Sequence, residues 1–166
     1  MPSSFDAVSD QDITVLAEQL GRPPRGVVGI AARCVCGRPL VVRTAPRLDD
    51  GTPYPTTYYL TCPPAVRGGQ LLVVGEPDRE LLHQPACLER AHRRDRRAHD
   101  AYLVDREALG HVEEIAGISA GGMPTRVKCL HVLVGHALAA GPGVNPIGDE
   151  ALTLIRDDWR PDRCTC

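Results

Sequence analysis

Glycine and proline interrupt this chain so often that much of its backbone must be turn and loop. The 166 residues include 16 glycines and 15 prolines, whereas aromatic residues make up only 4% of the sequence. Few large rings are therefore available to fill a core, and the core that we expect is small. A core of this kind favours an additional means of holding the chain together, such as a bound metal ion.

Length and composition predict one folded domain. The hydrophobic fraction is 43% and the charged fraction is 24%, so a largely disordered or fibrous protein is excluded. No apolar stretch approaches the roughly 18 residues that a membrane-spanning helix needs, and the N-terminus lacks the basic and apolar parts of a secretory signal. We therefore expect a cytoplasmic protein with no membrane span.

The charged residues do not point to a nucleic-acid partner. The formal net charge is −2, which gives no overall attraction to nucleic acid or anionic lipid. Arginines gather in residues 90–97, together with His92 and His99, but nearby acidic residues dilute this positive charge. A solvated helix face is the favoured interpretation, and an RNA-binding surface ranks last. A protein partner remains open, and the sequence does not identify one.

The seven cysteines are more naturally reduced thiols or metal ligands than a disulfide framework. An odd number cannot pair completely within the chain, and a cytoplasmic location disfavours disulfides.

The first half of the chain predicts one helix and three strands. Apolar residues recur at helical spacing in residues 10–20, behind an aspartate cap and before Gly21. Residues 26–34 and 39–44 predict a hairpin that turns through residues 34–37. Residues 56–62 form the strongest strand pattern, which Pro63 and Pro64 end.

The second half predicts helices. Residues 70–74 fit either a fourth short strand or part of a helix. Charged residues 89–109, apolar residues 125–140 and residues 149–156 predict three helices. The predicted fold is therefore α+β, a small antiparallel sheet of about three strands packed against helices in a single domain. We place this domain at residues 10–156, between a flexible N-terminus (residues 1–9) and a flexible C-terminal tail (residues 157–166).

Metal binding is the leading chemical prediction. Thiolates and imidazoles are the ligands that zinc prefers. Cys34 lies in a predicted turn, Cys62 ends a strand and Cys129 begins a helix, and such ends can meet at one edge of a layered domain. We predict a structural zinc site of Cys34, Cys62, Cys129 and His131, which would join the hairpin, the third strand and the main helix. The alternative is that these are small, buried, inert cysteines.

The two histidines after Cys129 differ in their expected roles. His136 lies about 10 Å from Cys129 along a regular helix, too far to share one ion. We therefore expect His136 to support a ligand or contact a substrate, or to be a hydrogen-bonded core residue. Cys129 at a helix N-terminus beside His131 is also the one arrangement that suggests a nucleophilic thiol.

A weaker pattern predicts anion binding. Flexible glycines precede the main helix, whose free amides and positive dipole end attract phosphate or carboxylate. The candidate residues are Ser119, Gly121, Gly122, Arg126 and Lys128. The order of residues is not that of a P-loop, and an ordinary capped loop is the alternative.

Three segments resemble one known family. They are GRPPRGVVGIAARCVCGRPLVV, DGTPYPTTYYLTCP and SAGGMPTRVKCLHVLVGHALAAGPGVNPIGDEAL, and together they cover well over half of the chain. They resemble the DUF501 family of actinobacterial and related bacterial proteins, which has no assigned activity. In the family pattern Cys34 fills R-C-x-x-G-x-P, and Cys129, His131 and His136 fill K-C-L-H-x4-H. Cys36 matches no cysteine of that pattern, and residues 68–90 depart from the helical region of the relatives.

The resemblance implies a cytosolic bacterial protein. Genes of relatives often lie near those of a septum-formation initiator and an exopolyphosphatase-like enzyme. The leading hypothesis is an accessory factor, linked to cell division or envelope biology, whose fold a structural zinc ion holds. The alternative is a metal- or thiol-dependent enzyme acting on a phosphorylated or otherwise anionic substrate. The sequence does not decide whether the protein is an enzyme.

Overall fold

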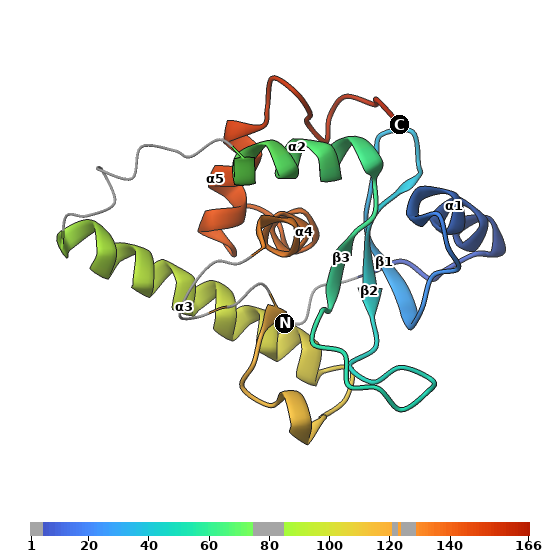
Figure 1. Cartoon of the computed structure of the whole chain (residues 1–166), viewed down its shortest axis with the longest axis horizontal. Coiled ribbons are helices and arrows are strands. Elements are labelled where there is room, and N and C mark those ends of the chain that lie inside the picture. The colour runs from blue at the N-terminus through green and yellow to red at the C-terminus, as the bar shows by residue number, and fades with distance from the viewer. Residues whose placement is uncertain (1–4, 75–84, 121–122, 124–128) are drawn as a thin grey trace.

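The computed structural model describes residues 5–74, 85–120, 123 and 129–166. Within these ranges a three-stranded antiparallel sheet packs between helices (Figure 1), which confirms the predicted α+β class. The strands are β1 (Val27–Arg33), β2 (Pro39–Thr44) and β3 (Tyr58–Leu60). The helices are α1 (Asp10–Leu20), α2 (Pro63–Val74), α3 (Pro85–Glu107), the short 3-10 helix η2 (Glu113–Ile115), α4 (Leu130–Ala140) and α5 (Pro146–Leu154).

Helix α1 begins and ends where local sequence signals place its boundaries. The Ser9 side chain accepts a hydrogen bond from the Asp12 backbone N–H, and the Asp12 carboxylate accepts one from the Ser9 N–H. This capping box satisfies amides that the first turn leaves without partners. Gly21, in the left-handed conformation at φ 66°, ends the helix. The predicted span of residues 10–20 is confirmed, with Ser9 as the cap in place of an aspartate.

The sheet separates two apolar layers. The strands lie in the order β1, β2, β3, and successive side chains point to opposite faces. Val42 packs with Leu16 of α1 on one face, whereas Val41 and Leu60 pack with Val134 of α4 on the other. Figure 1 shows α1 on one side of the sheet and α4 on the other, with α2 and α5 around α4. The larger core therefore lies between the sheet and α4.

Glycines allow α4 to approach its neighbours closely. A Cβ atom at Gly135 would lie 3.3 Å from the Tyr58 carbonyl oxygen, which is closer than most such contacts. A glycine at this position therefore lets α4 pack directly against the backbone of β3. A Cβ atom at Gly148 of α5 would lie 2.2 Å from the Leu133 carbonyl oxygen. These positions bring the backbones of α4, α5 and β3 into near contact.

Several elements differ from their predicted bounds. Pro63 and Pro64 do not simply end β3, because they begin α2, where the missing N–H of proline costs no helical hydrogen bond. Residues 70–74 accordingly belong to a helix, one of the two alternatives that the sequence left open. Helix α4 begins at Leu130, after Cys129 in an extended conformation, and residues 125–128 of the predicted helix lie outside the described residues.

The C-terminal residues pack onto the domain. Trp159, in the segment predicted as a tail, is buried in the core beside Ile155. Its backbone N–H donates to the Ile155 carbonyl oxygen at 2.7 Å, which extends the turn after α5. Figure 1 places the C-terminus beside the loop between β1 and β2. In the part of the chain that the structure describes, no helix combines the length and apolarity needed to cross a membrane.

Candidate metal centre

Four cysteines from opposite ends of the domain converge on one point. The Sγ atoms of Cys34, Cys36, Cys164 and Cys166 all lie within 4.8 Å of one another. We call these four residues the cysteine cluster. Cys34 is buried, and the other three are exposed. Four thiols at this separation form a donor set suited to one soft or borderline metal ion.

The hairpin between β1 and β2 holds the first pair. The Cys34 N–H donates to the Arg38 carbonyl oxygen at 2.9 Å, and the Gly37 N–H donates to the Cys34 carbonyl oxygen at 2.8 Å. Gly37 has a φ of 86°, which a side chain would strain. The turn after β1 therefore fixes both Cys34 and Cys36 at its tip.

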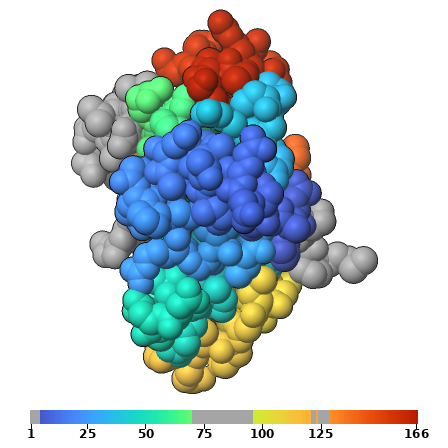
Figure 2. Space-filling model, turned by 90° about the vertical axis from the view of Figure 1, so that its right-hand side faces the viewer, coloured from blue at the N-terminus to red at the C-terminus, as the bar shows by residue number. Residues whose placement is uncertain are grey.

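The C-terminal tail supplies the second pair. Burial of Trp159 in the core anchors the tail a few residues before Cys164. Figure 2, in which the last residues lie against the turn that follows β1, shows the two segments side by side at the surface. Each pair has the spacing Cys-x-Cys, so each segment presents two thiols that are close together in the sequence.

The thiols of the cysteine cluster differ in acidity. Burial raises the pKa of Cys34 to about 12. Cys166 is exposed as a residue, but desolvation of its sulfur, which lies against the buried Cys62, raises its pKa to about 12 as well. The pKa of Cys36 is lowered to about 7, chiefly because the Arg38 backbone N–H donates to its sulfur. A bound cation would favour the thiolate form of all four residues, since only thiolates ligate metal.

Cys62 lies next to the cluster. Its Sγ atom is 3.6 Å from that of Cys166, and the residue is fully buried at the end of β3. Burial raises the pKa of this thiol. Cys62 therefore contacts the cluster, but it does not belong to the group of four whose sulfur atoms are mutually close.

The predicted set of Cys34, Cys62, Cys129 and His131 is not the group that the structure gathers. Among the described residues, the cysteine cluster is the single group of three or more potential ligands within ligand distance of one another, and Cys34 is its one member from the predicted set. Cys129 and His131 lie together elsewhere, with the Cys129 Sγ 3.6 Å from the His131 Nδ1. His131 at the start of α4 contacts Val66 of α2, so the structure does not bring Cys129 and His131 to Cys34, and metal binding by the predicted set stays a prediction.

His136 is a core residue and does not contact the cluster. Its ring is fully buried and stacks on Tyr58, with 5.2 Å between the ring centroids. The Asn145 Oδ1 accepts from the Gly148 N–H, so the Asn145 Nδ2 donates to the His136 Nδ1 at 3.2 Å. Burial lowers the pKa of His136 to about 4. The alternative of a hydrogen-bonded core histidine, stated from the sequence, matches this arrangement.

The other sequence candidates are only partly described. Ser119 is buried, with its Oγ 2.8 Å from the His99 Nδ1. The remaining anion-site candidates lie outside the described residues: Gly121, Gly122, Arg126 and Lys128. In the arginine run, Arg96 and Arg97 are exposed on α3, whereas His99 is buried.

Sequence reasoning missed Cys164 and Cys166, although a signal was present. The tail repeats the Cys-x-Cys spacing of Cys34 and Cys36, and two such pairs are a recognisable ligand pattern. Treating the last ten residues as flexible removed these thiols from consideration. Trp159, the one tryptophan of the chain, was a further signal, because so large an apolar ring favours burial over a free tail.

The family profile described as "Protein of unknown function (DUF501)" matches residues 30–153. The chain belongs to the DUF501 family. This finding confirms the resemblance drawn from the sequence. The match covers Cys34 and Cys36 of this DUF501 chain and ends before Cys164 and Cys166. Comparison with curated proteins and with solved structures gave no match.

Proposed function

We propose that the cysteine cluster binds one zinc ion and that this ion fastens the C-terminal tail to the β1–β2 hairpin. The single observation that carries the proposal is the mutual proximity of four thiols from two Cys-x-Cys pairs. Thiolates bound to zinc at about 2.3 Å stand roughly 3.8 Å apart in a tetrahedron. The Sγ atoms of the cluster lie within 4.8 Å of one another, so small side-chain adjustments would place all four thiolates on one ion.

The composition of the cluster favours a structural ion. Four cysteine ligands fill the tetrahedron, whereas a catalytic zinc keeps one position for water or substrate. Soft sulfur donors also exclude a preference for magnesium or calcium, which take oxygen ligands. Because the ligands come from residues more than a hundred positions apart, binding would close a long loop and stabilise the fold.

Elemental analysis of the purified full chain tests the proposal. We expect about one zinc ion per chain, lost in Cys34→Ser and Cys164→Ser. Cys129→Ser is the matched control, because it removes a thiol outside the cluster and belongs to the set that the sequence favoured. Trp159 reports on the tail, so removal of zinc by a chelator should shift its fluorescence to longer wavelength as the ring meets water.

Two results would contradict a zinc site at the cluster. The first is a wild-type chain that carries no metal and keeps its thermal stability in a chelator. The second is a zinc content that falls in Cys129→Ser and is unchanged in Cys164→Ser, which would return the site to the residues predicted from the sequence.

The biological setting proposed from the resemblance stays a prediction. We infer that the protein is a cytoplasmic accessory factor, linked to cell division or envelope biology, in which zinc has a structural role. Affinity capture from a native host, with wild type compared with Cys164→Ser, tests this prediction. Partners from these processes that bind wild type and not the variant would support it, and a partner set without such proteins would contradict it.

A further inference from the structure

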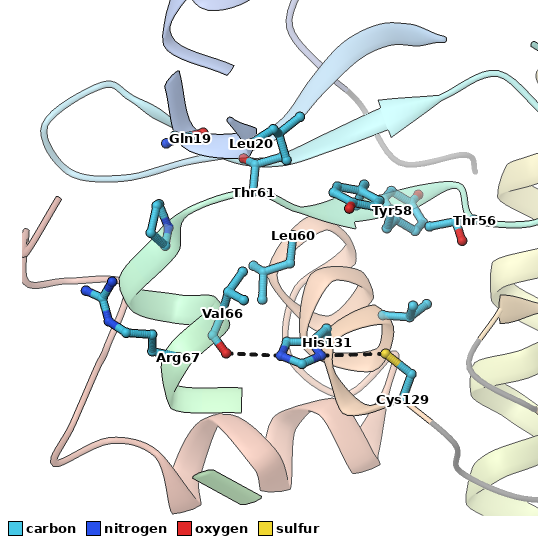
Figure 3. Close-up of a pocket in the computed structure, with 13 residues that line it drawn as sticks. Gln19, Leu20, Thr56, Tyr58, Leu60, Thr61, Val66, Arg67, Cys129 and His131 are labelled. Carbon is cyan, nitrogen blue, oxygen red and sulfur yellow. Dashed lines mark hydrogen bonds between the residues drawn. The ribbon is translucent and has the colours of Figure 1, made fainter. Parts of the chain in front are cut away.

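A cavity of about 520 Å³ lies beside β3, and its described lining includes none of the four clustered cysteines. The end of α1, β3, α2 and the beginning of α4 surround it. Its wall is largely apolar, with Leu20, Leu60, Val66 and Val132 among the lining side chains. Figure 3 shows Cys129 and His131 in this wall. The cavity has a size that accepts a small organic group.

The cavity contains a thiol and imidazole pair in a defined orientation. The His131 Nε2 lies 3.0 Å from the Val66 carbonyl oxygen, as the dashed line in Figure 3 marks. A carbonyl oxygen only accepts, so Nε2 carries a proton and the other ring nitrogen, Nδ1, faces the Cys129 sulfur at 3.6 Å. This is the order of nucleophile, base and orienting acceptor that activated thiols use.

The helices hold this pair in place. Gly69 of α2 leaves room for the ring, because a Cβ atom there would lie 3.0 Å from the His131 Cδ2. Cys129 is the N-cap of α4, and the backbone N–H groups of Val132 and His131 at the start of the helix favour its thiolate form. Together the His131 ring and these amides lower the pKa of Cys129, while the thiol raises the pKa of His131.

Other roles for the pair fit the cavity less well. Two ligands are too few for zinc, and among the described residues no third potential ligand joins Cys129 and His131. Cys129 is the one cysteine in the described lining, so the cavity offers no second thiol to resolve a disulfide. Phosphate recognition would need several cationic groups, whereas Arg67 is the one arginine of the described lining.

We propose that Cys129 is a catalytic nucleophile that removes an apolar acyl group from an ester or thioester, with His131 as its acid and base. The apolar wall takes the acyl chain. Arg67, which is exposed on α2 at the cavity, binds a negatively charged group of the leaving alcohol or thiol. This activity is separate from the zinc site and does not depend on it.

The reaction balances with water as the second reactant. The Cys129 thiolate attacks the carbonyl carbon, the bond to the leaving oxygen or sulfur breaks, and the leaving group takes the proton from His131. His131 then removes a proton from water, which attacks the thioester on Cys129. The carbon–sulfur bond breaks, the carboxylic acid leaves, and the Cys129 thiolate and protonated His131 are restored.

Acyl transfer from p-nitrophenyl esters to the full, zinc-loaded chain tests the inference. We expect a burst of p-nitrophenolate and one acyl group on the Cys129 peptide by mass spectrometry, with butyryl and octanoyl esters reacting faster than acetyl. Both signals should vanish in Cys129→Ala. His131→Ala should slow acylation and should lower the alkylation rate of Cys129 by iodoacetamide at pH 7 roughly tenfold or more. His111→Ala is the control, because His111 is exposed and does not line the cavity.

The inference is overturned if a folded wild-type chain shows no burst and no Cys129 adduct with any of these esters. It is also overturned if Cys129 is alkylated equally fast in wild type and His131→Ala. If Cys129→Ala does not fold, peptide mapping of the wild-type adduct decides whether the acyl group is on Cys129 or on another residue. Zinc content is measured on the same samples, so loss of the metal site is distinguished from loss of the thiol activity.

Discussion

The Sγ atoms of Cys62 and Cys166 lie 3.6 Å apart, although 104 positions separate the two residues in the sequence. Cys62 is fully buried at the end of β3, whereas Cys166 is exposed in the C-terminal tail. The tail therefore rests directly on the core, and its last cysteine faces both Cys62 and the cysteine cluster. Zinc would compete with Cys62 for the sulfur of Cys166.

Mild oxidation of the metal-free chain should link Cys62 to Cys166. The two sulfur atoms are already in contact, so a small movement of the tail allows the bond. Zinc should suppress this link, because a ligated thiolate is held away from Cys62. Peptide mapping without reduction measures the yield of the Cys62–Cys166 disulfide. Cys62→Ser is the control, because it cannot form this bond. An equal yield of the link with and without zinc would argue against Cys166 as a ligand.

Asp12→Asn should destabilise the fold by about 1–3 kcal/mol. Asp12 caps α1 and binds Arg33 of β1, with 2.7 Å between its Oδ1 and the Arg33 Nη1. Arg33 holds the pKa of this carboxyl well below its usual value. The stabilisation is therefore complete above the usual carboxyl pKa and is lost as the pH falls toward the lowered value.

Urea unfolding at several pH values measures this effect. The difference between wild type and Asp12→Asn should shrink as the pH falls below about 4. Asp10→Asn is the matched control, since Asp10 is an exposed acid in the same first turn and should change stability by about 0.5 kcal/mol or less. Equal effects of the two substitutions would contradict a specific role for the Asp12–Arg33 pair.

The buried ring of His136 should make the fold sensitive to moderate acid. Its pKa is lowered to about 4, chiefly by burial, against the opposing charges of Asp105 and Asp149. Because the folded pKa lies below the unfolded value, the unfolded chain binds the extra proton first. Stability is therefore complete above about pH 6.5 and falls by about 3 kcal/mol as the pH drops toward 4.

His136→Phe should remove this part of the pH dependence. The variant keeps an aromatic ring beside Tyr58 and loses the titrating group, so its stability should change less between pH 6.5 and 4 than that of wild type. Denaturant unfolding followed by Trp159 fluorescence measures both chains. His111→Ala is the comparison variant. His111 is exposed and Glu107 raises its pKa, so its removal should leave the loss of stability between pH 6.5 and 4 in place. An unchanged slope in His136→Phe would contradict the prediction.

Gly148→Ala should destabilise the protein by about 2 kcal/mol or more, despite the higher helix propensity of alanine. The new Cβ would lie 2.2 Å from the Leu133 carbonyl oxygen and 2.7 Å from the Ala137 Cβ, so α5 must move away from α4. Gly68→Ala is the matched control, because its Cβ would meet the flexible end of Ile155 at 3.3 Å. Thermal unfolding compares them, and equal melting temperatures would exclude close packing at Gly148.

Some features could be predicted because their causes are local. The apolar spacing of residues 10–20 and Gly21 predicted α1, and the β-branched runs predicted the hairpin that holds Cys34 and Cys36. The turn residues next to these cysteines determine where their backbone bends, whatever packs around it. The choice between strand and helix for residues 70–74 was not local, since α2 is stabilised by packing on α4 and α5.

The partners of Cys34 were decided by tertiary structure. The sequence indicated thiols at the ends of elements, and Cys34 is the one predicted ligand that lies among the four clustered cysteines. It did not show that burial of Trp159 brings Cys164 and Cys166 back to the hairpin, or that His131 of α4 lies between Cys129 and Val66 of α2. Spacing along a chain determines which nearby side chains share a face of a helix or strand. Whether distant segments meet depends on how whole apolar surfaces pack, and that packing is a property of the folded domain.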